Sequence, residues 1–180
     1  TTYRLLFHTY ARFSQVNEME SLVKDGRSRF KEPHFFAIDL ANYYQSRQTF
    51  HRSLNEYLIL IFNQPQFLRY ATDRILVMSD DTTNHFLIDS TLNAATIVDP
   101  SVRSILSSFY YKTGQFNKAF YEYKTIGINN QEDVNHWLLF ANNLRKENQT
   151  NLSIEAYHYF LTHFLLFLFF LVILGTFFQN

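Results

Sequence analysis

Histidine is the first residue type to examine for chemistry in this sequence, because imidazole serves as a general base, a proton shuttle and a metal ligand. The seven histidines are His8, His34, His51, His85, His136, His158 and His163. No H-E-x-x-H motif is present, and His158 and His163 are separated by five positions, so they do not share one helix face as a spacing of four would allow. We therefore expect these histidines at the surface or in turns, with no metal site among them.

Four aspartates form a second cluster that could hold a cation: Asp73, Asp80, Asp81 and Asp89. An EF-hand calcium loop needs alternating oxygen ligands, a central Gly and a bidentate Glu, and the segment lacks this pattern. Aspartate is a favoured N-cap residue because its carboxylate accepts hydrogen bonds from free backbone N–H groups. Asp80 and Asp81 are therefore predicted to end one helix and cap the next.

Enzyme chemistry finds no support in the sequence. It contains no Gly-rich phosphate loop with its lysine and no G-x-S-x-G elbow. Zero Cys excludes disulfides, a thiol nucleophile, Cys-ligated zinc and iron–sulfur clusters. The sequence thus predicts no catalytic residue, no cofactor and no enzymatic activity.

Charge and modification motifs add little. Lys+Arg and Asp+Glu are equal at 16 each, so the bulk charge does not favour a nucleic-acid partner, although the basic Lys112 directly follows the aromatic residues Phe109, Tyr110 and Tyr111. Asn148-Gln-Thr and Asn151-Leu-Ser match the N-glycosylation sequon and are interpreted as chance matches in an Asn-rich chain. No signal peptide is recognisable at the start, and the localisation is not assigned.

The elements that position these residues are expected to be helices. Four Gly and three Pro are too few for a turn-dense β fold, and apolar residues recur three and four apart from Tyr3 to Phe160. Asp99-Pro100 has the residue types of an N-cap followed by the first helical position. Short polar breaks are predicted at Gly26 and at 32–33, 64–66, 79–82, 99–100, 113–115 and 127–129.

An internal repeat organises these helices. Leu40-Ala41-x2-Tyr44 returns at an offset of 66 as Leu106-Ser107-x2-Tyr110, and at a further offset of 34 as Phe140-Ala141-x2-Leu144. A second small residue recurs in the following helix at Ser53, Ala119 and Ser153. Small residues are needed where two helices cross closely, so each copy is predicted to be a packed helix pair.

These residues resemble the tetratricopeptide repeat, a helix–turn–helix unit of about 34 residues. The match is carried by Trp137-x2-Phe140-Ala141-x2-Leu144, Ala119-x3-Tyr123, Ser53-x3-Tyr57, the closing Pro65 and the turn Gly114-Gln115-Phe116. The unit at 67–99 departs from the pattern, with Arg74 at a small-residue position and an altered turn over Met78–Asn84. The resemblance implies an all-α fold, an α-solenoid of antiparallel helix pairs, and the composition of the tail adds a long apolar C-terminal helix. The expected organisation is a diverged pair at 1–33, repeats at about 34–66, 67–99, 100–133 and 134–161, and an apolar helix or membrane anchor at 162–180.

The resemblance also implies a partner-binding face on the first helix of each pair, where a peptide or partner helix would lie. The residues expected there from the helix phase are Asn42, Gln45, Ser104, Ser108, Tyr111, Lys112, Asn142, Arg145 and Lys146. Amides suit a peptide backbone, and the basic side chains suit an acidic side chain or carboxylate. The expected function is a protein–protein interaction scaffold, and the alternative is a structural or assembly subunit, with or without a membrane anchor, that packs through its ends and its apolar C-terminal helix.

The C-terminal segment is so apolar that we expect it to be covered by lipid or by protein. Phe160–Phe178 would span about 28 Å as a helix, close to the thickness of a bilayer core, and no charged residue follows Glu155. Three interpretations stay open: a membrane anchor, a terminal helix covered by another chain, and an unnatural end of the coding region. The oligomeric state is not predicted.

Overall fold

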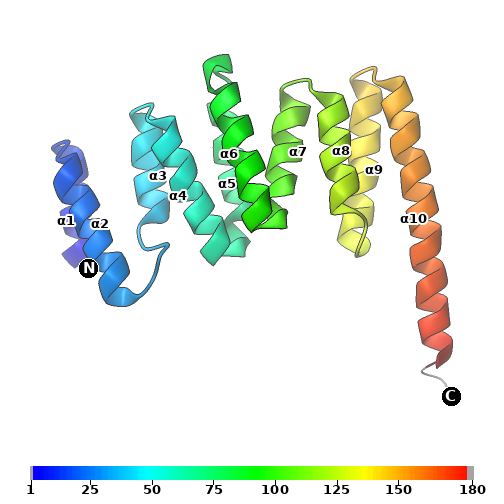
Figure 1. Cartoon of the computed structure of the whole chain (residues 1–180), viewed down its shortest axis with the longest axis horizontal. Helices are drawn as coiled ribbons and strands as arrows, with labels where there is room; N and C mark the ends of the chain where they lie inside the picture. The colour runs from blue at the N-terminus through cyan, green and yellow to red at the C-terminus, as the bar shows by residue number, and fades with distance from the viewer. Residues whose placement is uncertain (1, 178–180) are drawn as a thin grey trace. The chain divides into compact units, whose positions relative to one another are not determined.

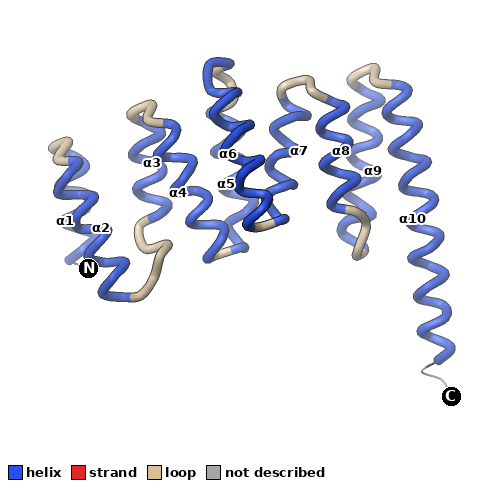
Figure 2. Tube along the Cα trace, viewed as in Figure 1, coloured by secondary structure: helices blue, strands red, loops and turns tan. Residues whose placement is uncertain are grey.

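The computed structural model describes the backbone of residues 2–177 and the side chains of residues 2–130 and 132–164. Over the described residues the chain is all-α, with no strand, which confirms the predicted all-α class (Figure 1, Figure 2). The helices are α1 (Thr2–Arg12), α2 (Val16–Phe30), α3 (Ala37–Ser46), α4 (Phe50–Asn63), α5 (Leu68–Met78), α6 (His85–Val98), α7 (Arg103–Lys112), α8 (Phe116–Ile126), α9 (Gln131–Lys146) and α10 (Thr150–Phe177). Short 3-10 turns precede three of them: η1 (Pro65–Phe67), η2 (Thr82–Asn84) and η3 (Pro100–Val102).

The chain forms two compact units, Thr1–Ala95 and Thr96–Asn180. The first unit contains the pairs α1/α2, α3/α4 and α5 with most of α6. The second contains α7/α8 and α9/α10. Within each unit, consecutive helices run antiparallel and are joined by short turns (Figure 2).

In four helix pairs, the two helices are joined by a turn of the same geometry. A residue with left-handed backbone occurs at Ser14, Gln48, Gly114 and Asn148, with φ of 56°, 58°, 73° and 59°. Successive positions in this set differ by 34, 66 and 34, which are the offsets of the sequence repeat. Side chains with a Cβ rarely adopt this conformation, so its return at fixed intervals indicates one recurring structural unit.

The same turn is closed by the same backbone hydrogen bond. In each case the residue after the left-handed position donates its N–H to the carbonyl five positions earlier, as in a helix C-cap that reverses the chain. The bonds are Gln15 N to Tyr10 O (2.9 Å), Thr49 N to Tyr44 O (2.9 Å), Gln115 N to Tyr110 O (2.8 Å) and Gln149 N to Leu144 O (2.9 Å). Tyr44, Tyr110 and Leu144 are all buried, so these three residues occupy equivalent places in their helix pairs.

The recurring small residues lie where the paired helices cross. Each crossing is marked by a serine hydroxyl that donates to a backbone carbonyl of the opposite helix, twelve positions away in the chain. The bonds are Ser53 Oγ to Ala41 O (2.8 Å), Ser107 Oγ to Ala119 O (3.1 Å) and Ser153 Oγ to Ala141 O (2.9 Å). All six residues are buried. A longer side chain would keep the backbones apart, which is the physical reason for small residues there.

The pair α5/α6 is built differently. Its buried residues on α5 are Ala71, Ile75 and Met78, and Arg74 is only half-buried beside them. No residue between 68 and 98 has a positive φ. The turn is instead fixed by Asp81, whose carboxylate accepts from the backbone N–H of Thr83 (2.9 Å). The predicted capping role of this aspartate is therefore confirmed, as is that of Asp99, which accepts from Ser101 N (2.9 Å) ahead of the helical turn that begins at Pro100.

One predicted break is wrong. Gly26 lies inside α2 and is buried, because the ring of Phe35 packs directly against it. A Cβ at this position would lie 2.4 Å from Phe35 Cε1, so glycine is required by a close side-chain approach and not by a turn. The break that ends α1 falls instead at residues 13–15, where the left-handed Ser14 reverses the chain.

Candidate functional site

The predicted binding residues of the first unit lie on α3 and are half-buried. Asn42 Oδ1 accepts from the hydroxyl of Tyr57 on α4 (2.8 Å), and its Nδ2 donates to the hydroxyl of Tyr70 on α5 (3.0 Å). Gln45 Oε1 also lies 3.0 Å from the Tyr57 hydroxyl, and its Nε2 donates to Arg74 O (3.3 Å). The two amides therefore connect α3 to α4 and α5.

Arg74 completes this polar network. Its Nε donates to the Tyr57 hydroxyl at 3.4 Å. Burial raises the pKa of Tyr57 above its ordinary value, although the nearby guanidinium of Arg74 acts in the opposite direction. The phenol therefore stays neutral and serves as a fixed hydrogen-bond centre for three side chains.

The corresponding residues of the second unit lie on α7 and α9. Asn142 Oδ1 accepts from the hydroxyl of Tyr157 on α10 (2.7 Å), and its Nδ2 donates to Leu138 O (2.9 Å). Ser104 and Ser108 donate to carbonyls of their own helical turns, Ser101 O (2.7 Å) and Ser104 O (2.8 Å). These three predicted site residues thus make local or intra-pair hydrogen bonds.

Three of the remaining four predicted residues are exposed. Tyr111 is half-buried, and its ring packs edge-on against Phe116 and Phe140, with centroids 5.4 and 6.0 Å away. Burial and the negative charge of Glu147 raise the pKa of its phenol. Lys112, Arg145 and Lys146 are exposed in the last turns of α7 and α9, where cations interact favourably with the helix dipole. We call Tyr111, Lys112, Arg145 and Lys146 the basic end of the second unit.

Two tyrosines that fix this face were not among the predicted site residues. Tyr57 follows Asn42 by 15 positions, and Tyr157 follows Asn142 by the same interval. The repeated spacing was visible in the sequence, because both pairs lie at matching positions of the repeat. What the sequence did not show is that the hydroxyl and the amide point at each other.

A pocket of about 620 Å³ lies between α8 and α10 on the second unit. Its wall includes Tyr159, which stacks on Trp137 and on His163 with centroids 4.6 and 3.8 Å away, and Lys124, whose ammonium lies 5.6 Å from the Tyr159 ring. His158 and His163 both border this pocket despite their spacing of five. Among the described residues, no group of three His, Asp or Glu side chains is arranged to hold a metal ion.

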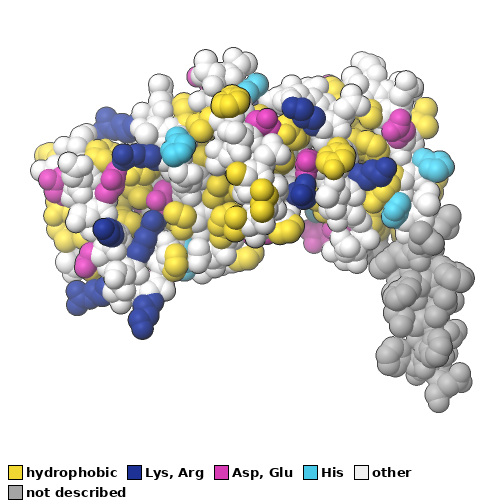
Figure 3. Space-filling model, in the orientation of Figure 1, with side chains coloured by type: hydrophobic (Ala, Val, Ile, Leu, Met, Phe, Trp, Pro, Cys, Tyr) yellow, Lys and Arg dark blue, Asp and Glu magenta, His cyan; other side chains and the backbone are white. Residues whose placement is uncertain are grey.

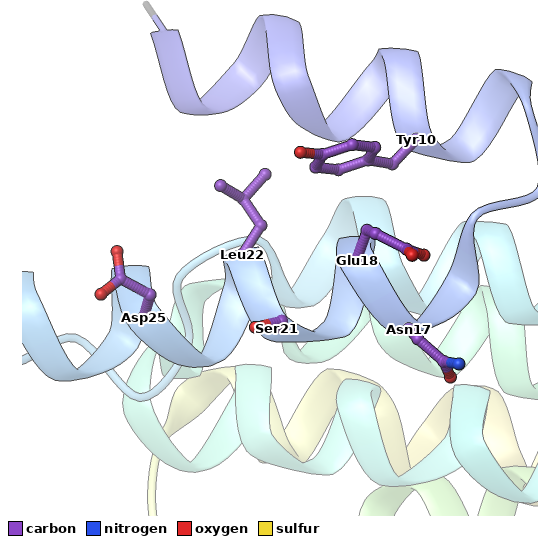
Figure 4. Close-up of a pocket in the computed structure, with 6 residues that line it drawn as sticks. All are labelled: Tyr10, Asn17, Glu18, Ser21, Leu22 and Asp25. Carbon is purple, nitrogen blue, oxygen red and sulfur yellow. The ribbon is translucent and has the colours of Figure 1, made fainter.

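A second pocket, of about 470 Å³, lies between α1 and α2 (Figure 4). Its residues are Tyr10, Asn17, Glu18, Ser21, Leu22 and Asp25. On the face shown in Figure 3, acidic, basic and hydrophobic side chains are interspersed.

Comparison with protein-family models, with curated proteins and with solved structures finds no match. Within the described residues, no helix combines the length and apolarity needed to cross a bilayer. The side chains of the predicted anchor, Phe160–Phe178, lie outside the described residues beyond Phe164.

Proposed function

We propose that the chain is a tetratricopeptide-like α-solenoid that acts as a non-enzymatic scaffold and binds a peptide or a partner helix on the first helices of its pairs. The observation that supports it is the recurrence of one helix pair, with the same left-handed turn position and the same serine–carbonyl crossing at the repeat spacing. A pair of this kind cannot bury its apolar faces alone, so stacked pairs form a preformed surface. Preformed surfaces bind with a small ordering cost.

The basic end of the second unit gives this surface its chemical preference. Asn42, Gln45 and Asn142 already bond to tyrosines, so their role is to orient the first helices. Lys112, Arg145 and Lys146 are exposed, and an ammonium or guanidinium pairs strongly with a carboxylate. The ring of Tyr111 supplies an apolar contact beside them. The favoured ligand is an acidic peptide segment or a peptide C-terminus.

Charge reversal tests this assignment. The variant Lys112→Glu/Arg145→Glu/Lys146→Glu is expected to bind acidic peptides at least tenfold more weakly, because each contact changes from attraction to repulsion. The probe is an array of short synthetic peptides with acidic C-terminal residues, with affinities of the selected peptides measured by fluorescence anisotropy. The far-UV circular dichroism spectrum should not change.

A matched variant distinguishes the effect of the basic end from the effect of a change in net charge. Lys24→Glu/Arg29→Glu/Lys31→Glu makes the same change in charge at exposed positions on or just after α2. It should leave peptide affinity within about twofold of the unmodified chain. Equal losses in the two variants, or no loss in either, would reject the basic end as the binding site.

A second function, as a structural or assembly subunit, is favoured by one observation. Apolar side chains stand exposed on α8 and on the described part of α10: Tyr121 at 65%, Ile154 at 61% and Leu161 at 54%. Where exposed apolar side chains form a contiguous patch, the patch is normally covered by another chain or by lipid. In this alternative the apolar C-terminal helix makes the contact, either with a partner chain or with a membrane.

Deletion of the residues after Phe160 tests this alternative. If it holds, the full chain sediments as an oligomer or floats with phosphatidylcholine vesicles, and the shortened chain does neither. A full chain that remains monomeric and does not bind vesicles would exclude both the assembly contact and the anchor.

A further inference from the structure

The pocket between α1 and α2 is an open groove with acidic side chains at both ends and an apolar centre. Glu18 and Asp25 are exposed, Leu22 lies between them on α2, and Tyr10 faces α2 from α1 (Figure 4). Asn17 and Ser21 form the remaining wall, so the lining residues include no Lys or Arg. Asp25 also accepts a hydrogen bond from the Tyr3 hydroxyl. The groove therefore carries two negative charges without a basic partner among its own residues.

The spacing of these side chains is that of a helix–helix contact. Glu18, Leu22 and Asp25 lie at positions i, i+4 and i+7 of α2, which form one stripe along a helix. This stripe is about 10.5 Å long, or almost two turns. A helix lying along it would present its own residues i, i+3 or i+4, and i+7 at the same intervals.

The next helix pair, α3/α4, shows which kind of element packs on the face equivalent to that of Tyr10 and Leu22. Tyr44 and Glu56 lie one repeat interval after Tyr10 and Leu22, so they occupy the equivalent positions of α3 and α4. Both are contacted by α2. The Tyr44 hydroxyl donates to Glu20 at 2.6 Å, and Glu56 accepts from Arg27, with Nη1 to Oε1 at 3.3 Å. The face that contains Tyr10 and Leu22 is therefore the kind of face on which a helix packs in this fold.

We propose that the groove between α1 and α2 binds an amphipathic helix that carries basic residues at positions i and i+7 and a large apolar residue at i+3 or i+4. The basic residues pair with Glu18 and Asp25, and the apolar residue packs against Tyr10 and Leu22 in the groove of about 470 Å³. This site goes beyond the scaffold function proposed above. It lies in the first unit and selects a partner of opposite charge to that chosen by the basic end.

The test uses the full chain and designed helical peptides. The probe is a fluorescent peptide of four to five helical turns, with Lys at i and i+7 and Leu at i+4 on an Ala/Gln background. A second peptide replaces both Lys by Glu, and a third keeps the Lys and Leu residues but has Pro at its centre. Fluorescence anisotropy is expected to give at least tenfold tighter binding for the Lys helix than for either alternative, with affinity that falls as salt is added.

A charge swap makes the assignment specific. The variant Glu18→Lys/Asp25→Lys should bind the Lys helix at least tenfold more weakly than the unmodified chain does. It should bind the Glu helix more tightly. The matched variant Asp73→Lys/Glu132→Lys reverses two exposed carboxylates outside the groove and should bind as the unmodified chain does.

Three peptide-binding results would each overturn the proposal. They are equal binding of the Lys and Glu helices, equal binding of the proline peptide, and no change on charge swap. Self-association of the unmodified chain that is abolished by Glu18→Lys/Asp25→Lys would also reject it, because the groove would then be occupied by a second copy. Lys112→Glu/Arg145→Glu/Lys146→Glu should leave the Lys helix bound, which distinguishes failure of this site from failure of the basic end.

Discussion

Trp137→Ala is expected to lower the free energy of unfolding by about 3 to 5 kcal/mol, the range for truncation of a fully buried aromatic side chain. Trp137 is 1% exposed, and its ring contacts Phe120, Tyr123, Phe140 and Tyr159. Its Nε1 donates to Gly127 O (3.2 Å), which connects α9 to the turn that precedes it. Removal of the indole leaves a cavity bordered by α8, α9 and α10. Urea unfolding followed by far-UV circular dichroism measures the loss.

Two further variants provide comparisons for this loss of stability. Trp137→Phe keeps an aromatic ring but loses the hydrogen bond to Gly127, and should cost about 1 to 2 kcal/mol. Leu139→Ala, on the same helix but 57% exposed, should change stability by less than about 0.5 kcal/mol. If Trp137→Ala proved as mild as Leu139→Ala, the aromatic cluster would not be the core of the second unit.

Ala41→Leu is expected to lower the free energy of unfolding by about 3 kcal/mol, because the added carbons have no space at the crossing of α3 and α4. Ala41 is fully buried, and its carbonyl accepts from Ser53 Oγ at 2.8 Å. A leucine here must separate the two backbones or adopt a strained rotamer. Separation of the backbones would also break the serine–carbonyl hydrogen bond.

The matched control is Ala94→Leu. Ala94 is exposed on α6, and Leu and Ala have similar helix propensities, so stability should change by less than about 0.5 kcal/mol. Equal effects of the two substitutions in urea unfolding would mean that the recurring small residues do not mark a close crossing. The repeat would then lose its packing explanation.

The repeated helix pair was predictable from the sequence because its determinants are local. Ala41, Ser107 and Ala141 mark close crossings, and their partners lie only twelve positions further along the chain. Asp81 and Asp99 cap turns through atoms two positions away. Such contacts are set by spacing and residue type, which the sequence contains directly.

At Gly26 the prediction from the sequence was wrong. A glycine inside a helical pattern indicates a break, but Phe35 from the following loop packs on it and makes the missing Cβ a packing requirement. In the same way, Ser14 and Gln48 adopt left-handed backbone without being glycine. The turn geometry is imposed there by the packed helices on each side and not by residue preference.

The sequence predicted on which helices the candidate binding residues lie, but not their hydrogen-bond partners. The helix phase located Asn42, Gln45 and Asn142 on the first helices, but each amide proved to be bonded to a tyrosine of a neighbouring helix. Pairing of this kind depends on the distance between two helices. The basic residues Arg145 and Lys146 are solvent-exposed, as the helix phase predicted.

By itself, the sequence determined the all-α class, the repeat spacing and the absence of thiol chemistry, because residue counts and periodicity decide all three. The tertiary structure decided which polar groups pair with one another and which border a groove. Glu20 and Glu18 illustrate the difference, since they are two positions apart on α2. Glu20 accepts from Tyr44 and pairs with Arg52, whereas Glu18 borders an open groove. Neighbouring residues on a helix face in different directions, so their roles depend on what the fold brings to each side.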